Sequence, residues 1–448
     1  MPNATALRLI TLLLAGAASA AAADVPPGPP HFDQPLTLVQ LTDLALKNNP
    51  STKLAWAEIR NSEAGLELAR AGYWPQLELD YSLSRAKQTT AGGVSNPAAT
   101  SYGPSLSLSW LLWDFGTRSG RTDAAKFALT ASQLDANQTM QDLILTVEQD
   151  YYQVLGLQAL QDADAQSVQD ASANLDAANQ RRGAGLATLG DVYQAEAALA
   201  TAQLALQTAA GQLAVARGQL AVAVGYDADT PLPLATLEKA VAARMPDENV
   251  RALLEKAGGA RPELLAAKAQ EQQALASLEA ADGQGWPTLG LSGSTGRTTT
   301  RLADGTSTTN RNWNAGLSLS FPLFTGFANR AESRQAQSQV DIAQANTQAL
   351  VQAVQLEVWQ AYQNMHTAVS TLDTAAAGLK SAQQAADVTN ARYKNGLDSI
   401  LDVLSAQAAL ANARVQDVQA RLNWFAAQAA MGHAVGGLDA PKDPMELP

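Results

Sequence analysis

The chain has 448 residues, with 42 acidic and 30 basic side chains that give a formal net charge of −12. This acidic balance argues against nucleic acid as a partner, because nucleic-acid binding needs clustered Lys and Arg. No cysteine is present, which excludes disulfides, thiolate metal sites and anchoring through a lipid-modified cysteine. The three histidines, His31, His366 and His433, lie far apart in sequence and are predicted to be structural. We therefore predict no metal site and no cofactor.

Residues 1–23 are predicted to be a secretory signal peptide. Arg8 precedes a short apolar run, and small residues then continue to Ala23, so cleavage after Ala20 or after Ala23 fits the pattern. The alternative is a membrane anchor, but the apolar run is too short to span a bilayer. Residues 24–35 are rich in proline and are predicted to be irregular.

Two helices and two strands are predicted next. The helices cover residues 36–46 and 51–72, and a proline follows each of them. The strands, residues 76–85 and 102–112, are joined by a polar loop. Each is about ten residues long, the length that a tilted strand needs to cross hydrocarbon. Apolar and polar side chains alternate in both strands, with the apolar positions at Leu77, Leu79, Tyr81 and Leu83 and at Leu106, Leu108, Trp110 and Leu112.

Two long helices are predicted after the strands. Residues 117–182 contain no proline and little glycine, so they are predicted to form one rod of about 100 Å. The return helix, residues 189–224, carries a heptad repeat in which large residues hold one position and alanines the other, a pattern typical of closely packed coiled coils. The repeat consists of Val192, Leu199, Leu206, Leu213 and Leu220 with Ala195, Ala202, Ala209, Ala216 and Ala223.

The second half of the chain repeats the first at an offset of about 211 residues, which indicates an internal duplication. The first repeat is predicted at residues 36–225, with its β-hairpin at 76–112. The second is predicted at residues 247–436, with its β-hairpin at 287–323. The matching segments are Tyr73-Trp74-Pro75 with Gly285-Trp286-Pro287, Leu106-Ser107-Leu108-Ser109-Trp110 with Leu317-Ser318-Leu319-Ser320-Phe321, and Gly185-Leu186 plus Asp191-Val192 with Gly396-Leu397 plus Asp402-Val403.

The remaining segments follow from the same comparison. Residues 226–246 are predicted to form a connection on the outside of the helices near their middle, and residues 437–448 a C-terminal tail. The second repeat is predicted to have a polar loop at 297–312, a rod at 328–394 and a return helix at 399–431. Its apolar strand positions are Leu289 and Leu291, then Trp313, Ala315, Leu317, Leu319, Phe321 and Leu323.

Alternating strands also fit a solvated sheet in a soluble protein. The tryptophans favour a membrane instead, because five of the eight lie in or beside these strands, where an interfacial aromatic girdle would require them. Four strands leave two open edges that lipid cannot satisfy, so several chains must close one barrel together. The five interface tryptophans are Trp74, Trp110, Trp113, Trp286 and Trp313.

These features resemble the outer membrane efflux protein (TolC) family over essentially the whole mature chain. The opening Leu36-Thr37-Leu38 with Asn49-Pro50, the paired Trp-Pro elements and the paired Gly-Leu and Asp-Val segments carry the resemblance. It implies an α+β membrane protein. Three chains, each giving four strands, would form a twelve-stranded transmembrane β-barrel continuous with a long coiled-coil α-helical barrel in the periplasm.

The resemblance also implies the function. The protein would be a passive exit duct of a tripartite efflux or type I secretion system, in the outer membrane of a Gram-negative bacterium. Its partners would be two further copies of itself, the lipid bilayer, a periplasmic adaptor (membrane fusion) protein and an inner-membrane pump of the RND, ABC or MFS class. The cargo is not predicted.

In this family the periplasmic end of the tunnel is closed by inward helices with acidic rings at the narrowest point. The resemblance maps Asp402 onto a ring aspartate, places Ser405 where many members have a second acid, and maps Tyr393 onto a tip tyrosine. Asp398 replaces a basic residue found in some members, and Asp191 is the tip aspartate of the first half. The alternative for Asp191 and Asp402 is that they cap the N-termini of their helices.

Three other functions fit the sequence less well. A periplasmic coiled-coil scaffold or adaptor without a membrane barrel would explain the helices but not the four lipid-patterned strands. An autonomous porin would leave the helical half without a purpose. An enzyme is not predicted, because Gly183-Ala184-Gly185 sits at a helix turn rather than after a strand, where a phosphate-binding loop would lie.

Overall fold

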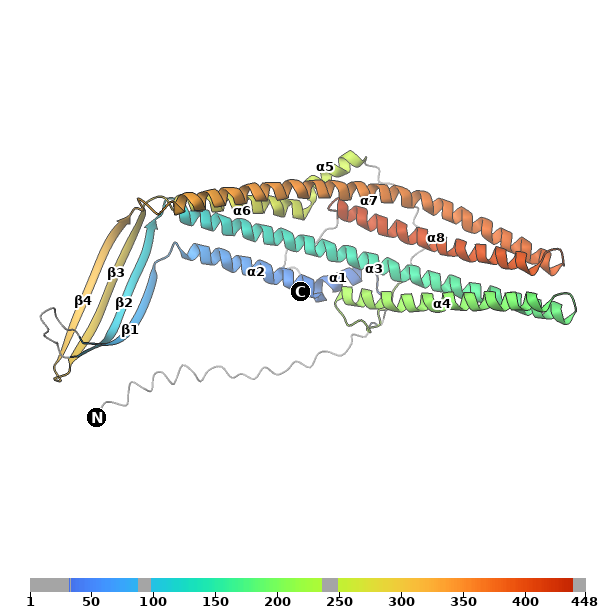
Figure 1. Cartoon of the computed structure of the whole chain (residues 1–448), viewed down its shortest axis with the longest axis horizontal. Helices are drawn as coiled ribbons and strands as arrows, with labels where there is room; N and C mark the ends of the chain where they lie inside the picture. Colours follow the sequence, from blue (N-terminus) through green and yellow to red (C-terminus); the bar gives the residue numbers. More distant parts are fainter. Residues whose placement is uncertain (1–31, 33, 88–97, 236–248, 438–448) are drawn as a thin grey trace.

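A four-stranded sheet stands at one end of a long bundle of helices in the computed structural model (Figure 1). The structure describes residues 32, 34–87, 98–235 and 249–437. The predicted signal peptide, most of the segment 24–35 and nearly all of the tail 437–448 therefore lie outside the described residues. The bundle ends, opposite the sheet, in two helical hairpin turns (Figure 1).

The two halves of the chain contain the same elements in the same order, as the duplication predicts. The two long helices, α3 and α7, are each 67 residues long. The first half runs through α1 (Leu38–Asn48), α2 (Pro50–Ala71), β1 (Gln76–Ala86), β2 (Ala99–Trp113), α3 (Thr117–Gly183) and α4 (Leu189–Val224), and the second through α5 (Val250–Ala260), α6 (Pro262–Gly283), β3 (Thr288–Leu302), β4 (Ser307–Ser320), α7 (Ala328–Lys394) and α8 (Ile400–Ala434).

The prediction of a polar loop at residues 297–312 is wrong. β3 continues to Leu302 and β4 begins at Ser307, so only four residues form the turn. Threonines from both sides of the predicted loop pair across the hairpin, as at Thr299 opposite Thr309. β-branched residues suit a strand even where they are polar, and this preference outweighed the composition that suggested a loop. β2 also begins earlier than predicted, at Ala99.

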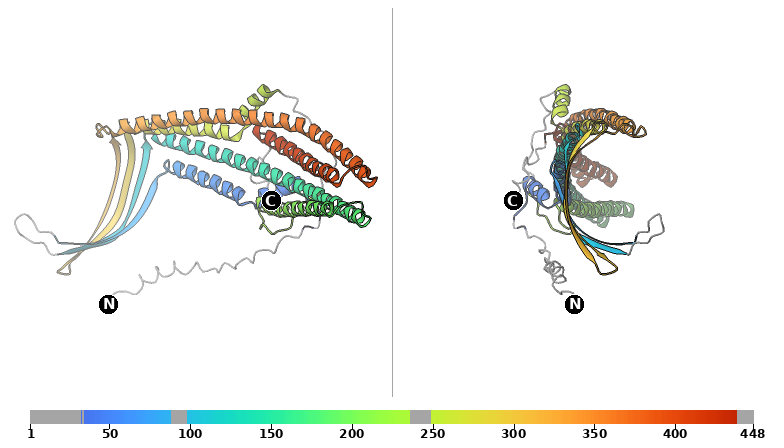
Figure 2. Two further views of the ribbon diagram at one scale, coloured as in Figure 1. Left: turned by 45° about the vertical axis from the view of Figure 1, so that its right-hand side comes forward. Right: turned by 90° about the vertical axis from the view of Figure 1, so that its left-hand side faces the viewer.

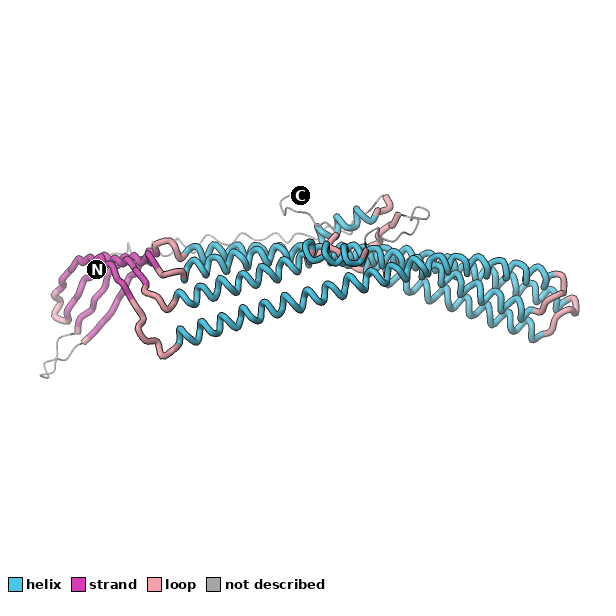
Figure 3. Tube along the Cα trace, turned by 90° about the horizontal axis from the view of Figure 1, so that it is seen from above, coloured by secondary structure: helices cyan, strands magenta, loops and turns pink. Residues whose placement is uncertain are grey.

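The sheet is antiparallel with the order β1-β2-β3-β4, so β1 and β4 are its two edges. Viewed from the end, the sheet is strongly curved (Figure 2). Such curvature is what a segment of a barrel wall requires, since each strand must turn relative to its neighbour. The helices leave the sheet side by side and continue it as a curved layer (Figure 3).

The helices pack with their small and branched residues inward. α3 contacts α4 over one part of its length and α2 over another, and α7 does the same with α8 and α6. None of the ten heptad residues of α4 is fully exposed, and seven of them are buried. The predicted coiled-coil face of α4 is therefore the face that packs on its neighbours.

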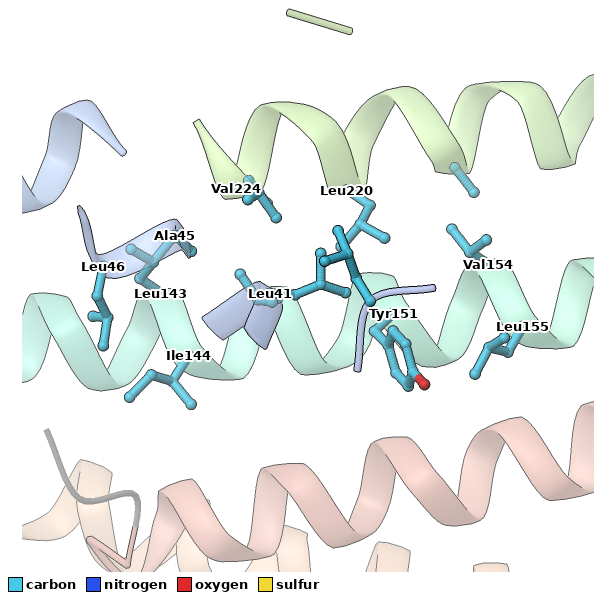
Figure 4. Packing of buried hydrophobic residues seen from close by; sticks show 14 of the residues in the cluster. Leu41, Ala45, Leu46, Leu143, Ile144, Tyr151, Val154, Leu155, Leu220 and Val224 are labelled. Atoms are coloured by element: carbon cyan, nitrogen blue, oxygen red, sulfur yellow. The ribbon is translucent and has the colours of Figure 1, made fainter. Parts of the chain in front are cut away.

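Residues of α1, α3 and α4 form the largest core cluster (Figure 4). These three helices meet near the middle of the bundle (Figure 1). Leu41 and Val154 are fully buried there, and Leu220 is nearly so. Burying one such aliphatic side chain contributes about 1.5–3 kcal/mol, so this cluster fixes α1 against the long helix. The described start of the predicted connection also packs here, since Leu36 N–H donates to the Pro233 carbonyl at 2.7 Å.

Each half stacks a short helix end to end on its return helix, and the residue before the short helix joins them. The Asn49 amide donates to the Ala223 carbonyl at the end of α4 at 2.8 Å, and it caps α2 by accepting from Ser51 N–H. At the equivalent junction Arg261 donates to the Ala434 carbonyl at the end of α8 at 3.2 Å. The same end-to-end joint is thus made by a neutral amide in one half and by a guanidinium in the other.

Further charged side chains contact Arg261 and its neighbours at this joint. Arg261 is buried, pairs with Glu263, and donates to Glu357 at 2.8 Å. Glu357 also contacts His433 Nδ1 at 3.2 Å, while His433 Nε2 lies 2.7 Å from Asp142 of α3. Hydrogen bonds to Asp142, which has the larger effect, and to Glu357 raise the pKa of His433 to about 9. Hydrogen bonds to His433, again the larger effect, and to Arg261 lower the pKa of Glu357 to about 2. His433 is therefore charged in the folded protein at neutral pH.

This joint should make the stability of the protein fall at alkaline pH. The pKa of His433 is about 9 in the folded protein and 6.5 for an ordinary histidine side chain in the unfolded chain, so between these pH values the folded state holds one more proton than the unfolded state. The free energy of unfolding then decreases as pH rises, and the contribution is lost above about pH 9. The melting temperature, followed by circular dichroism between pH 6 and 10, should show this fall. The fall should be absent in His433→Gln; a variant with an unchanged alkaline slope would contradict the assignment.

Candidate channel wall and tip

The register of the sheet places most of the predicted apolar positions of the four strands on one face. The prediction is wrong for Phe321 and Leu323, because β4 ends at Ser320, and Leu112 lies at a register shift in β2. Leu77 of β1 lies opposite Leu108 of β2, Trp110 opposite Leu291 of β3, and Leu291 opposite Leu317 of β4. Directly opposed residues of an antiparallel pair share a face, so these pairs extend one apolar surface across the sheet. We call it the apolar face. On the two edge strands its side chains are exposed in the single chain, where Leu79 and Leu319 retain more than 70% of their accessible surface, while Leu108 and Leu291 of the inner strands are half-buried.

The other face of the sheet carries small polar side chains. Ser107 lies opposite both Glu78 and Ser294, and Ser318 lies opposite Gly290. Asn314 accepts hydrogen bonds from the backbone and the hydroxyl of Ser294 on this face. A wall with one apolar and one polar face suits a barrel between lipid and a water-filled lumen.

Four of the five predicted interface tryptophans lie at the end of the sheet next to the helices. Trp113 contacts Phe115 edge-on, and Phe115 stacks on Trp286 at 5.8 Å between ring centroids. Trp110 donates its indole N–H to the Tyr73 carbonyl at 2.9 Å, and Trp74 is exposed beside it.

Trp313 is the exception, because it lies within β4 opposite Thr295. It is the most exposed of the five, with 80% of its surface accessible. β4 extends beyond Trp313 to Ser307, at the end of the sheet away from the helices. The five tryptophans therefore lie at two levels along the strands, and their placement at the membrane surfaces stays a prediction.

The two hairpin turns far from the sheet begin their return helices in the same way. Thr188 accepts from Asp191 N–H at 3.2 Å, and the Asp191 carboxylate accepts from Thr188 N–H at 2.7 Å. Ser399 and Asp402 make the equivalent pair at 3.3 and 3.0 Å. Both are capping boxes, so Thr188 and Ser399 are the N-caps and the two aspartates hold the third position of the helix.

Capping does not neutralise these aspartates. The Ser399 hydroxyl donates to the Asp402 carboxylate at 2.6 Å. This bond, and then the bond from the Ser399 backbone, lowers the pKa of Asp402. Asp402 is exposed and stays ionised at neutral pH, and Ser405 is exposed on the next turn of the same helix.

One side chain links the two hairpins at this end. Arg181, near the end of α3, donates to the Tyr393 carbonyl at 2.5 Å and lies over the Tyr393 ring at 4.6 Å from its centroid. Tyr393 is buried against Ile400 and Val403. Burial raises the pKa of its phenol, Arg181 lowers it, and Asp191 of the other hairpin raises it. The structure thus brings Tyr393 and Asp191 to one place.

Asp398 takes part in a different contact. It forms an ion pair with Arg392 at 2.9 Å, within the second hairpin. The residues that sequence reasoning missed are therefore Arg181 and Arg392. Arg392 lies six positions before Asp398 and could have been found from charge alone, but Arg181 lies 212 positions from Tyr393.

The described part of the chain shows no helix apolar and long enough to cross a bilayer. Among the described residues, no group of three or more His, Asp or Glu side chains is arranged so that it could hold a metal ion. A curved sheet with one apolar face, joined to long helices that end in paired hairpins, defines the class of outer-membrane channel proteins with a helical extension.

Comparisons with known proteins indicate the same class of protein. The model of the family described as outer membrane efflux protein matches residues 41–226 and 253–437, one stretch in each half. Protein CyaE of Bordetella pertussis is 30% identical over 93% of this chain and 89% of its own length. The pyoverdine export outer membrane protein OpmQ of Pseudomonas aeruginosa is 27% identical over 92% and 86%. The CmeC outer membrane channel of Campylobacter jejuni superposes with a TM-score of 0.79 at 22% identity, over 89% of this chain and 85% of its own.

The chain belongs to the outer membrane efflux protein family. It is a non-enzymatic outer-membrane channel that extends into the periplasm and works as a homotrimer with a periplasmic adaptor and an inner-membrane pump. The alternative of a scaffold without a membrane channel has no support from these comparisons.

The register gives a direct test of which face meets lipid. Leu108→Arg should impair assembly of the trimer, because a charge at mid-bilayer depth costs about 2–4 kcal/mol. Ser107→Arg, on the neighbouring residue and the opposite face, should be tolerated far better. The measurement is the fraction of trimer in outer-membrane extracts run without heating, and equal losses in both variants would contradict the assignment of the faces.

Proposed function

We propose that the helical tip, residues 181–193 and 392–405, is the gate of the channel. The observation that carries this proposal is the contact of Arg181 with Tyr393, which joins the α3–α4 hairpin to the α7–α8 hairpin. Opening a passage between the hairpins requires them to separate. Because this contact holds the end of α3 to the end of α7, it favours the closed arrangement.

The groups around the contact of Arg181 with Tyr393 favour a contact that can break and re-form. The Tyr393 hydroxyl and the Arg181 Nε atom are buried without a hydrogen-bond partner among the described residues. Unsatisfied buried polar atoms cost about 1–3 kcal/mol each, so the closed contact is offset by a penalty that separation would relieve. The gate would then be held by a small difference in free energy, which a partner at the tip could overcome.

Asp402 would set the ion preference of the gate. In a trimer three copies of this exposed and ionised carboxylate lie around one axis, and clustered carboxylates attract cations. The capping bonds from Ser399 fix the carboxylate on the first turn of α8. Capping and ion selection are therefore compatible roles. With Ser405 in place of a second acid, we propose one acidic ring rather than two.

The hairpin contact can be tested by removing one guanidinium. Arg181→Ala should raise the open probability of the channel, because it removes both the hydrogen bond to the Tyr393 carbonyl and the contact with the ring. The measurement is the open probability in single-channel recordings from planar bilayers. Arg182→Ala is the matched control, since Arg182 is the exposed neighbour with the same charge. If the two variants behave alike, the contact does not hold the gate.

The role of the Asp402 charge can be separated from its role in capping. Asp402→Asn keeps an acceptor for Ser399 N–H but removes the charge, so it should weaken cation selectivity and divalent-cation block. Ser399→Ala should retain selectivity, since the Asp402 charge is kept, but lower the melting temperature. Loss of an N-cap costs about 1 kcal/mol. Reversal potentials in a KCl gradient give the selectivity, and wild-type values for Asp402→Asn would show that Asp402 is a cap only.

A further inference from the structure

Four arginines lie on the apolar face of the sheet at the end away from the helices. Arg85 is on β1, Arg297 and Arg301 are on β3, and Arg311 is on β4. Each is an even number of positions from an apolar-face residue on its own strand, as Arg311 is from Trp313, and alternate residues of a strand share a face. All four are exposed.

Their positions in the ladder bring them together in pairs. Arg297 lies directly opposite Arg311. Arg85 and Arg301 both lie opposite Thr100 of β2, one on each side of it. Like charges directly opposite one another destabilise a sheet, so this arrangement has a cost that the described strands do not offset.

No acidic side chain is found on this face in the described strands. The two acids of the sheet, Glu78 and Asp80, are on the other face of β1. Asp304, in the turn between β3 and β4, accepts from Thr306 N–H at 2.9 Å. The segregation is complete, with arginines on the apolar face and carboxylates on the polar face.

The arginine pair borders a depression in the apolar face. This depression, of about 300 Å³, is lined by both Arg297 and Arg311 and by Leu79, Pro104 and Leu106. Trp313 lies only two residues from Arg311 on the side of the helices, about 7 Å along the strand. Interfacial tryptophans lie at the level of lipid headgroups, so the guanidiniums lie at or just beyond that level.

We propose that Arg297 and Arg311 bind the phosphomonoester headgroup of a lipid in the outer leaflet, with its acyl chain along Leu79 and Leu106. Two opposed guanidiniums can each present a fork of N–H donors to one phosphate dianion, which a single arginine cannot fully neutralise. Arg85 and Arg301 extend the basic surface for a second phosphate. The proposal rests on the membrane placement of the sheet and is independent of the gate at the tip.

The experiment is native mass spectrometry of the detergent-purified trimer titrated with diphosphoryl lipid A. Arg297→Gln/Arg311→Gln should weaken binding about tenfold or more, because the charge-assisted bonds to the phosphate are lost. Glu78→Gln/Asp80→Asn, which alters two charges on the opposite face, is the matched control and should bind as the wild type does. Equal weakening in both variants would overturn the site.

Measurements on the wild-type trimer keep the proposal testable if the double variant fails to assemble. Phosphatidylglycerol and inorganic phosphate, added as competitors at the same concentration, should displace lipid A only weakly. Equal displacement by phosphatidylglycerol would overturn the preference for a phosphomonoester, and equal displacement by phosphate would overturn a lipid as the ligand.

Discussion

The backbone hydrogen bonds at the two edges of the sheet are the constraint on which the rest of this structure depends. β1 and β4 each leave one row of N–H and C=O groups unpaired in a single chain. In hydrocarbon every such group costs several kcal/mol, and only closure of the sheet removes the cost. In a homotrimer, pairing of β4 with β1 of the next copy would close a ring of twelve strands and would arrange the helices that continue each strand around the same axis.

Local patterns in the sequence were sufficient to predict most of this fold. The bounds predicted for α4 and α7 agree with the structure at both ends. The heptads of α4 leave few alternatives to a helix, and α7 follows from the match of the second half to the first. The faces of the strands were also predictable. Leucine and serine alternate, and a shift of one residue in the pairing would move every leucine to the polar face, so the pattern excludes such a shift. The capping residues were only partly predicted. Asp191 and Asp402 were considered as N-terminal caps, whereas the structure makes Thr188 and Ser399 the N-caps, each three positions before its aspartate.

What could not be predicted depends on contacts between distant segments or on two competing signals. Nothing near Arg181 in the sequence indicates that its partner is Tyr393, because the two hairpins meet only after the whole bundle has formed. At residues 297–312 the polar composition favoured a loop and the threonines favoured strands, and the sequence alone does not rank these signals. The pairing of Thr299 with Thr309 decides between them only once the register is known.

The equal length of α3 and α7 makes the bundle a molecular ruler. At 1.5 Å per residue, 67 residues set a distance of about 100 Å between the sheet and the hairpin turns. A deletion in one rod alone would draw its turn back by 1.5 Å per residue and rotate it by about 100°, so the two turns would no longer meet. Evolution can therefore change the reach of this protein only by altering both halves together, which makes the periplasmic spacing an inherited property of the duplication.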